Sequence, residues 1–159
     1  MIFLKTENFP QVPKIYEILS VELSTLLPHA KIDHIGSTSI AGALTKGDLD
    51  ILVRVQKSDF ETTLLEIKEI GFTEKFGTLR TPSLCMLVTE KYDWDVAIQL
   101  VEAGSQFEDF LKFRDRLNAD PALVNEYNQL KLSASGADPV EYRAKKSTFI
   151  ERVLAIVEE

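Results

Sequence analysis

A run of small polar residues, Gly36, Ser37, Thr38 and Ser39, follows a short strand candidate. Glycine lets a backbone approach a ligand closely, and three hydroxyl groups come directly after it. We expect the chain to enter a short helix here, whose first N–H groups would attract a phosphate. Lys46 follows and could add a positive charge, although a solvated loop lysine is an equally good interpretation of that residue.

Two carboxylates, Asp48 and Asp50, come next, at the start of an apolar run that continues from Ile51 to Val53. Alternate residues of a strand point to the same face, so both carboxylates can converge on one hard cation. Mg²⁺ prefers oxygen ligands and often bridges carboxylates to substrate phosphates. Mn²⁺ could take its place. A Gly-Ser turn or an Asp-x-Asp pair alone is common, whereas the two in strand–turn–strand order predict a phosphate and metal site.

A third carboxylate would strengthen a site of this kind, because two metals can align the attacking and leaving oxygens of a phosphoryl displacement. Asp95 leads a further apolar run, as Asp50 does, and is the favoured third ligand. Asp93 shares its face and stays open as the alternative. Trp94, between them, points to the opposite face and is expected to pack in the core.

The elements that must position these residues follow from apolar periodicity. Helical spacing predicts a helix from Pro13 towards Pro28, and Ser58 with Glu61 predicts a capping box for a second helix that ends before Gly71. The strand candidates are Lys31–Ile35, Leu49–Val55, Phe72–Phe76, Leu84–Thr89 and Trp94–Val101.

The last third of the chain is expected to be helical. Apolar faces lie between Phe107 and Leu117, after an Asp120-Pro121 helix start, and between Tyr142 and Leu154, with a linker over residues 133–138. Together these elements predict one α+β domain over residues 1–159. It would consist of a mixed sheet flanked by helices, with a helical tail that packs on the same sheet.

Composition limits the classes of function. The net charge is −7 and the pI is about 4.9, which argues against a large nucleic-acid footprint but permits a small nucleotide held by a metal. No apolar run approaches the roughly 20 residues of a membrane helix. Glu7 comes too early for a signal peptide. Cys85 is the only cysteine, so the expected compartment is the cytoplasm. The oligomeric state does not follow from the sequence.

The pattern of Gly-Ser followed by Asp-x-Asp resembles the nucleotidyltransferase superfamily. Within it, the string from His34 to Gly42, with Lys46 and Asp50, resembles the GrpB family. The tail is similar as well, at Phe113-Arg114-Asp115, Tyr127, Leu130-Lys131, Tyr142, Lys145-Lys146 and Phe149-Ile150.

This resemblance implies a nucleotidyltransferase-like mixed sheet and a pocket for a nucleoside triphosphate with Mg²⁺. It also implies transfer of a nucleotidyl group to a small-molecule or protein acceptor. Two departures stand out. Many relatives carry an apolar residue at Asp48, and many carry a His-x-His pair around Ala97 and Gln99, which this chain lacks.

Arg80, Arg114, Lys131, Lys145 and Lys146 could approach a triphosphate if the tail folds over the site, although each alone is read more simply as a surface or ion-paired side chain. Three functions therefore stay open. The first is a nucleotidyltransferase with Asp48, Asp50 and Asp95 on the metal. The second is a non-catalytic module that binds a nucleotide or coenzyme. The third is an antitoxin-like protein whose acidic surface docks a basic partner.

Overall fold

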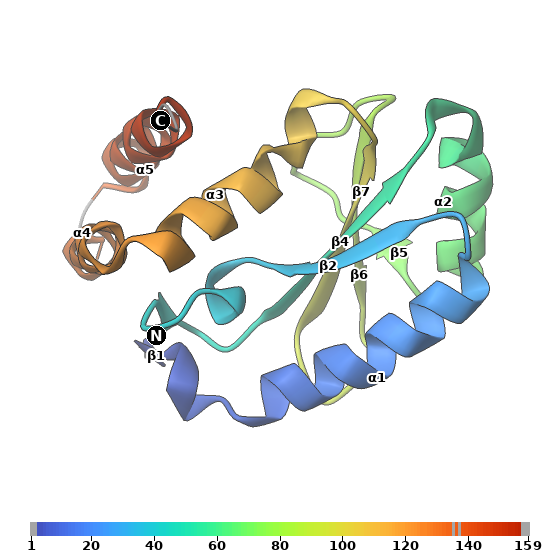
Figure 1. Cartoon of the computed structure of the whole chain (residues 1–159), viewed down its shortest axis with the longest axis horizontal. Helices are drawn as coiled ribbons and strands as arrows, with labels where there is room; N and C mark the ends of the chain where they lie inside the picture. The colour runs from blue at the N-terminus through green and yellow to red at the C-terminus, as the bar shows by residue number, and fades with distance from the viewer. Residues whose placement is uncertain (1–2, 135, 137, 157–159) are drawn as a thin grey trace.

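The computed structural model describes residues 3–134, 136 and 138–156. A five-stranded mixed sheet, in the order β2-β4-β7-β6-β5, lies between two groups of helices (Figure 1). The central strands β4 and β7 are parallel, and the other neighbouring strands of this sheet are antiparallel. A small second sheet pairs β1 with β3. The strands are β1 (Leu4–Lys5), β2 (Lys31–Ile35), β3 (Leu44–Thr45), β4 (Leu49–Val55), β5 (Thr73–Glu74), β6 (Leu84–Thr89) and β7 (Val96–Glu102).

The helices divide between the two faces of the sheet. Helices α1 and α2 cover one face, whereas α3, α4 and α5 lie on the other side, with α3 against β2 (Figure 1). Among the described residues, no helix is both long and apolar enough to cross a membrane. The helices are α1 (Gln11–Leu26), α2 (Phe60–Glu69), α3 (Asp109–Ala119), α4 (Pro121–Ser133) and α5 (Pro139–Leu154), with short 3₁₀ helices η1 (Thr6–Asn8), η2 (Ser37–Ser39), η3 (Lys57–Asp59) and η4 (Gln106–Glu108).

The largest core lies between the sheet and helices α1 and α2. Strand β4 contributes alternate residues to it, and α1 and α2 add Leu19, Leu23, Leu64 and Ile67. Burial of one such side chain is worth about 1.5–3 kcal/mol relative to leaving it exposed. The alternation in β4 is therefore strongly specified, because a one-residue slip would move its whole apolar set out of the core.

The tail builds a second, smaller core. Leu117, Val124, Tyr127 and Phe149 of α3, α4 and α5 pack against Ile40 and Ala43 of the loop after β2. Asp120 and Asp138 cap α4 and α5, since their carboxylates accept hydrogen bonds from Ala122 N and Val140 N. The expected linker over residues 133–138 includes residues 135 and 137, which lie outside the described part of the chain.

The overall α+β prediction is confirmed, and three local predictions are wrong. Ser58 does not cap α2: it lies inside η3, and Asp59 takes the N-cap position without a side-chain hydrogen bond. The strand expected over Phe72–Phe76 shrinks to β5, because Phe76 is fully in solvent. Strand β7 begins at Val96, since Trp94 turns into the core and donates a hydrogen bond from Nε1 to Gly47 O over 2.6 Å.

Candidate functional site

Asp48 and Asp50 flank Leu49 at the start of β4. Leu49 and Ile51 are fully buried on the α1–α2 side of the sheet. Since successive residues of a strand point to opposite faces, both carboxylates point to the side that carries the helical tail. Asp50 lines a cavity on that side.

The Asp50 carboxylate lies in a mostly desolvated position. Burial, together with the negative charge of Asp48, raises the pKa of Asp50 from its ordinary 3.8 to about 6. The positive charges of Lys146, Lys75 and Lys131 act in the opposite direction. Among the described residues, no hydrogen bond or ion pair ends on this carboxylate. A buried acid beside a second acid, with room in front of it, fits a hard cation.

The third carboxylate, Asp95, is reached through the pairing of two parallel strands. Strands β4 and β7 pair Leu49 with Val96, so Asp48 and Asp95 stand at neighbouring positions, one residue before their respective strands, where Leu49 N also donates to Asp95 O over 2.9 Å. Both Asp93 and Asp95 are exposed, and the residue directly opposite Asp50 is Ala97. Within the described ranges, no three His, Cys, Asp or Glu side chains lie close enough to hold one metal ion.

The turn after β2 brings its backbone against Asp50. Gly36 has φ of +78°, and a Cβ on it would collide with Asp50 Oδ2 and stand 3.0 Å from Asp50 Cβ. Glycine is therefore needed at this position for two reasons, the left-handed backbone and the close approach. The short helix η2 follows at once, as the sequence predicts.

The hydroxyl groups of η2 hold the turn together. Ser37 Oγ donates to Thr45 Oγ1 over 2.8 Å, and Ser39 Oγ donates to Gly36 O over 2.5 Å. The buried Thr38 donates to Asp48 O over 2.8 Å and pairs with His34 Nε2 at 2.9 Å. His34 thus helps to fix the turn through Thr38. The N–H groups of Ser37 and Thr38, at the start of η2, have no partner within that helix.

Three lysines from separate parts of the chain stand close enough to repel one another. Lys131 of α4 is 7% exposed, donates from Nζ to Leu44 O over 2.5 Å and lies 4.2 Å from the Tyr127 ring centroid. Burial, then the charges of Lys146 and Lys46, lower the pKa of Lys131 to about 7. Burial and Lys46 also lower the pKa of Lys146. This surplus of positive charge beside Asp50 is the environment that a polyphosphate would neutralise.

The other candidate cations of the sequence are engaged elsewhere. Arg80 pairs with Glu74, and Lys145 pairs with Glu141 along α5. Arg114 donates to His34 O over 2.8 Å and pairs with Asp115, so it supports β2 from α3.

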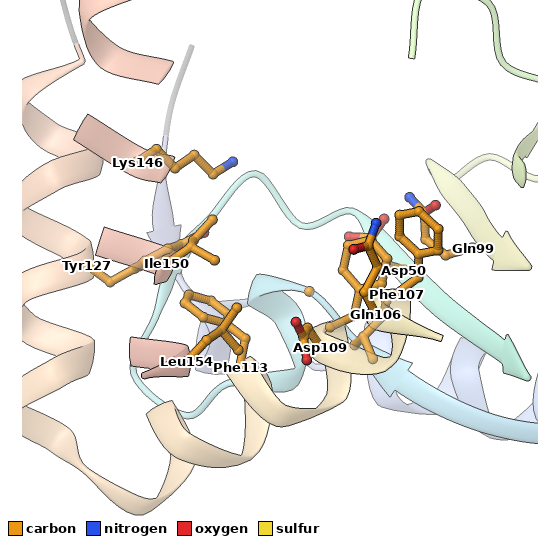
Figure 2. Close-up of a pocket in the computed structure, with 13 residues that line it drawn as sticks. Asp50, Gln99, Gln106, Phe107, Asp109, Phe113, Tyr127, Lys146, Ile150 and Leu154 are labelled. Carbon is orange, nitrogen blue, oxygen red and sulfur yellow. The ribbon is translucent and has the colours of Figure 1, made fainter. Parts of the chain in front are cut away.

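The cavity in front of Asp50 has a volume of about 470 Å³ and lies between the sheet, α3 and α5. Figure 2 shows Lys146 and Ile150 of α5 on one side of it, and Asp50 with Gln99, Gln106 and Phe107 on the other. Tyr127 lines it as well while packing on Phe113 and Phe149, with ring centroids 5.6 and 5.5 Å away. The sequence marks Gln99 only as a departure from the His-x-His pair of many relatives, and it gives no signal for Gln106, which has no local pattern.

Two asparagines of the tail hold the backbone of the loop after η2. Asn118 of α3 donates to Ser39 O and accepts from Ala41 N, both at 3.0 Å. Asn128 of α4 donates to Gly42 O over 2.9 Å and accepts from Leu44 N over 2.8 Å. Each side-chain amide uses both its donor and its acceptor, so these residues fix the loop in two places.

Comparison with solved structures shows which known proteins share this architecture. The Cid1 poly(U) polymerase bound to MgGTP superposes with a TM-score of 0.55 at 19% identity, over 77% of this chain and 41% of that one. A second Cid1 structure, an H336N mutant bound to MgATP, gives a TM-score of 0.55 at 17% identity, over 84% of this chain and 43% of that one. The fold is therefore nucleotidyltransferase-like.

The match to one family is much more complete. The conserved protein GrpB from Enterococcus faecalis superposes with a TM-score of 0.70 at 23% identity, over 91% of each chain. A UPF0157 protein of Vibrio cholerae is 48% identical over 97% of this chain and 82% of its own length. A UPF0157 protein of Deinococcus radiodurans is 31% identical over 80% and 68%. The GrpB protein family matches residues 5–155, and the chain belongs to that family.

Proposed function

We propose that this chain is a Mg²⁺-dependent nucleotidyltransferase that moves a nucleotidyl group from a nucleoside triphosphate to an acceptor. One observation carries the proposal: Asp50 and Lys146 line one cavity, Asp48 adds negative charge beside Asp50, and Lys131 and Lys46 add positive charge beside Lys146. Magnesium with a triphosphate would neutralise both at once. The nucleotidyltransferase-like fold, and the Mg-nucleotides bound by Cid1, support the same assignment.

The roles follow from position. Asp48 and Asp50 would hold the metal, with Asp95 as the third ligand, and Mn²⁺ could replace Mg²⁺. The backbone of Gly36 and of η2 would meet the phosphates, with Ser37, Thr38 and Ser39 keeping that backbone in place. The metal would polarise the reacting phosphate and stabilise developing charge.

The protein's own part of the reaction is electrostatic. The oxygen of the acceptor hydroxyl would form a bond to the α-phosphorus while its proton passes to solvent, and the bond from that phosphorus to the bridging oxygen would break, so that pyrophosphate leaves. Lys146, which lines the cavity, would stabilise the negative charge that gathers on the leaving group, and Lys131 and Lys46 would add to its field. Fixed charges of this kind stabilise a transition state without reorganising.

Calorimetric titration with each nucleoside triphosphate, with and without Mg²⁺, tests the proposal. Wild-type protein should bind at least one Mg-nucleotide, and Asp50→Asn should weaken that binding at least roughly tenfold, about 1.4 kcal/mol. Wild-type protein that binds no nucleotide would overturn the proposal. Binding without product across acceptors screened by mass spectrometry would favour the non-catalytic module instead.

The third ligand has a test of its own. Asp93 and Asp95 are both exposed and two residues apart, so Asp93→Asn is a matched control for Asp95→Asn. We expect only Asp95→Asn to weaken Mg²⁺ binding in the presence of nucleotide. The opposite ranking would move the role to Asp93, and equal affinities would leave the metal on Asp48 and Asp50 alone.

A further inference from the structure

The side of the cavity away from Lys146 carries a separate set of polar groups. Gln99 of β7, Gln106 of η4 and Asp109, the first residue of α3, all line the cavity. Figure 2 shows Gln99 and Gln106 grouped with Asp50, whereas Lys146 stands on the opposite side. The cavity thus has two chemically different sides, and the proposed metal ligand Asp50 lies on the side of the glutamines.

These polar groups are accessible to a ligand, since Gln99 is half-buried and Gln106 and Asp109 are exposed. Among the described residues, the side chains of Gln99, Gln106 and Asp109 take part in no hydrogen bond or ion pair with another residue. Each glutamine offers two donors and one acceptor oxygen, and Asp109 offers acceptors. Phe107, half-buried, and Phe110, 37% exposed, add apolar surface next to them. The set can therefore bind a ligand that has both hydrogen-bonding groups and an apolar face.

The charged residues around the cavity limit the class of ligand that this side can bind. Among the described residues that line the cavity, Lys146 is the only cation, and it lies on the other side. Lys75, at the end of β5, acts on Asp50 at longer range but does not line the cavity. Asp109 adds negative charge to a chain whose net charge is already −7. A nucleic-acid strand needs a groove of positive charge along its phosphates, and this side offers the reverse.

We infer that Gln99, Gln106, Asp109 and Phe107 form the acceptor subsite, and that the acceptor is a small hydroxyl-bearing molecule that is neutral or carries an amine. The inference rests on the proposed function, since it places the acceptor beside Asp50 and the nucleotide on the lysine side. It separates this chain from the Cid1 poly(U) polymerase in the kind of acceptor, although the two share a fold.

Glutamine side-chain amides give a direct test by NMR. Protein labelled with ¹⁵N is first loaded with Mg²⁺ and an α,β-methylene analogue of ATP, GTP, CTP or UTP, taken singly. Glucose, glucosamine, adenosine, glucose 6-phosphate and pentaadenylate with a free 3′-hydroxyl are then added one at a time. Gln99→Leu and Gln106→Leu assign the two side-chain signals.

The inference expects glucose, glucosamine or adenosine to shift the Gln99 and Gln106 side-chain signals, and the two phosphate-bearing compounds to leave them in place. Shifts caused by pentaadenylate or glucose 6-phosphate would overturn it, and so would a panel in which no compound shifts them. If no analogue shifts the backbone signals of Gly36 and Lys146, the proposed function itself fails, and that result is distinct from the others.

Substitution of each glutamine tests its contribution to the affinity for the acceptor. For a compound that binds, Gln99→Leu and Gln106→Leu should each weaken its affinity by roughly threefold to tenfold, the value of one neutral hydrogen bond. Gln56→Leu, at an exposed glutamine before η3, is the matched control and should leave the affinity unchanged. Equal affinities for all four proteins would overturn the assignment of the glutamines. Repeating the nucleotide titration on each variant separates a lost acceptor from a lost nucleotide.

Discussion

The two faces of strand β4 meet different surroundings. One face places Leu49, Ile51 and Val53 in the large apolar core against α1 and α2. The other face carries Leu52 in a smaller core and places Asp50 at the edge of a cavity, where no hydrogen bond or ion pair among the described residues ends on its carboxylate. The first face is apolar at these positions, whereas the second keeps a carboxylate whose burial costs stability. The binding role proposed for this cavity would explain why the carboxylate is kept there.

A substitution in the large core between the sheet and helices α1 and α2 should cause the largest loss of stability. Leu64 of α2 is 3% exposed, and Leu64→Ala should lower the free energy of unfolding by about 2–5 kcal/mol, because it leaves a cavity in a packed core. Urea denaturation measures this change. The neighbouring Leu65 is 60% exposed and provides the control, since Leu65→Ala should change the free energy by less than about 0.5 kcal/mol. Similar losses in both variants would contradict the contrast between the faces.

A substitution of Asp50, which faces the cavity, should instead raise the stability of the protein. Asp50→Asn removes a buried charge, so it should stabilise the metal-free protein by about 1–3 kcal/mol at pH 8. Because the folded-state pKa is raised to about 6, the unfolded chain releases its proton first as the pH rises. Stability from this group is therefore lost between about pH 4 and pH 6, and the gain from Asp50→Asn should vanish near pH 4.

Urea denaturation at both pH values checks that window, and Glu69→Gln at the exposed end of α2 serves as the control without such a gain. A destabilised Asp50→Asn protein at pH 8 would show that the carboxylate has a structural partner after all.

Two glycine substitutions, with smaller effects, should distinguish the close approach of Gly36 to Asp50 from backbone strain. Gly36 and Gly77 have φ of +78° and +77°, but a Cβ on Gly77 would meet no atom within 4 Å. Both alanine variants should lose about 1 kcal/mol from strain, and Gly36→Ala should lose more because it displaces the Asp50 carboxylate. Only Gly36→Ala should also weaken Mg-nucleotide binding, measured by calorimetry. Equal binding by both variants would remove the turn from the site.

The smallest expected effect is the uptake of a proton by Lys131 when a nucleoside triphosphate binds. Since the pKa of Lys131 is lowered to about 7, its side chain is mostly neutral at pH 8 and mostly charged at pH 6. A bound triphosphate favours the ammonium form, so binding at pH 8 should take up roughly one proton, and less at pH 6. Calorimetry in buffers of different ionisation enthalpy measures the uptake. Lys131→Met should reduce it, whereas Lys145→Met, at an exposed lysine paired with Glu141, should not.

Sequence reasoning reached the parts of the site that are local in the chain. Strand alternation placed Asp48 and Asp50 on one face, and a glycine before small polar residues predicted the turn at Gly36. The sequence places Lys131 and Lys146 near the site only if the tail folds over it, because docking of α4 and α5 is a tertiary event. Gln99 stands out only as a departure from the His-x-His pair of many relatives. Gln106, Asn118 and Asn128 give no signal, since nothing in their sequence neighbourhood distinguishes them from surface amides.

The two asparagines that hold the loop after η2 also affect the order in which the parts of the chain reach their final structure. Asn118 and Asn128 bond to loop residues that precede them by 77 to 86 positions. At roughly 5–20 residues per second of synthesis, the loop waits several seconds for its clamps. During that interval the sheet can pair while the loop is still unshaped. We therefore expect the loop of a nascent chain to take its final shape only when the last third of the chain has emerged.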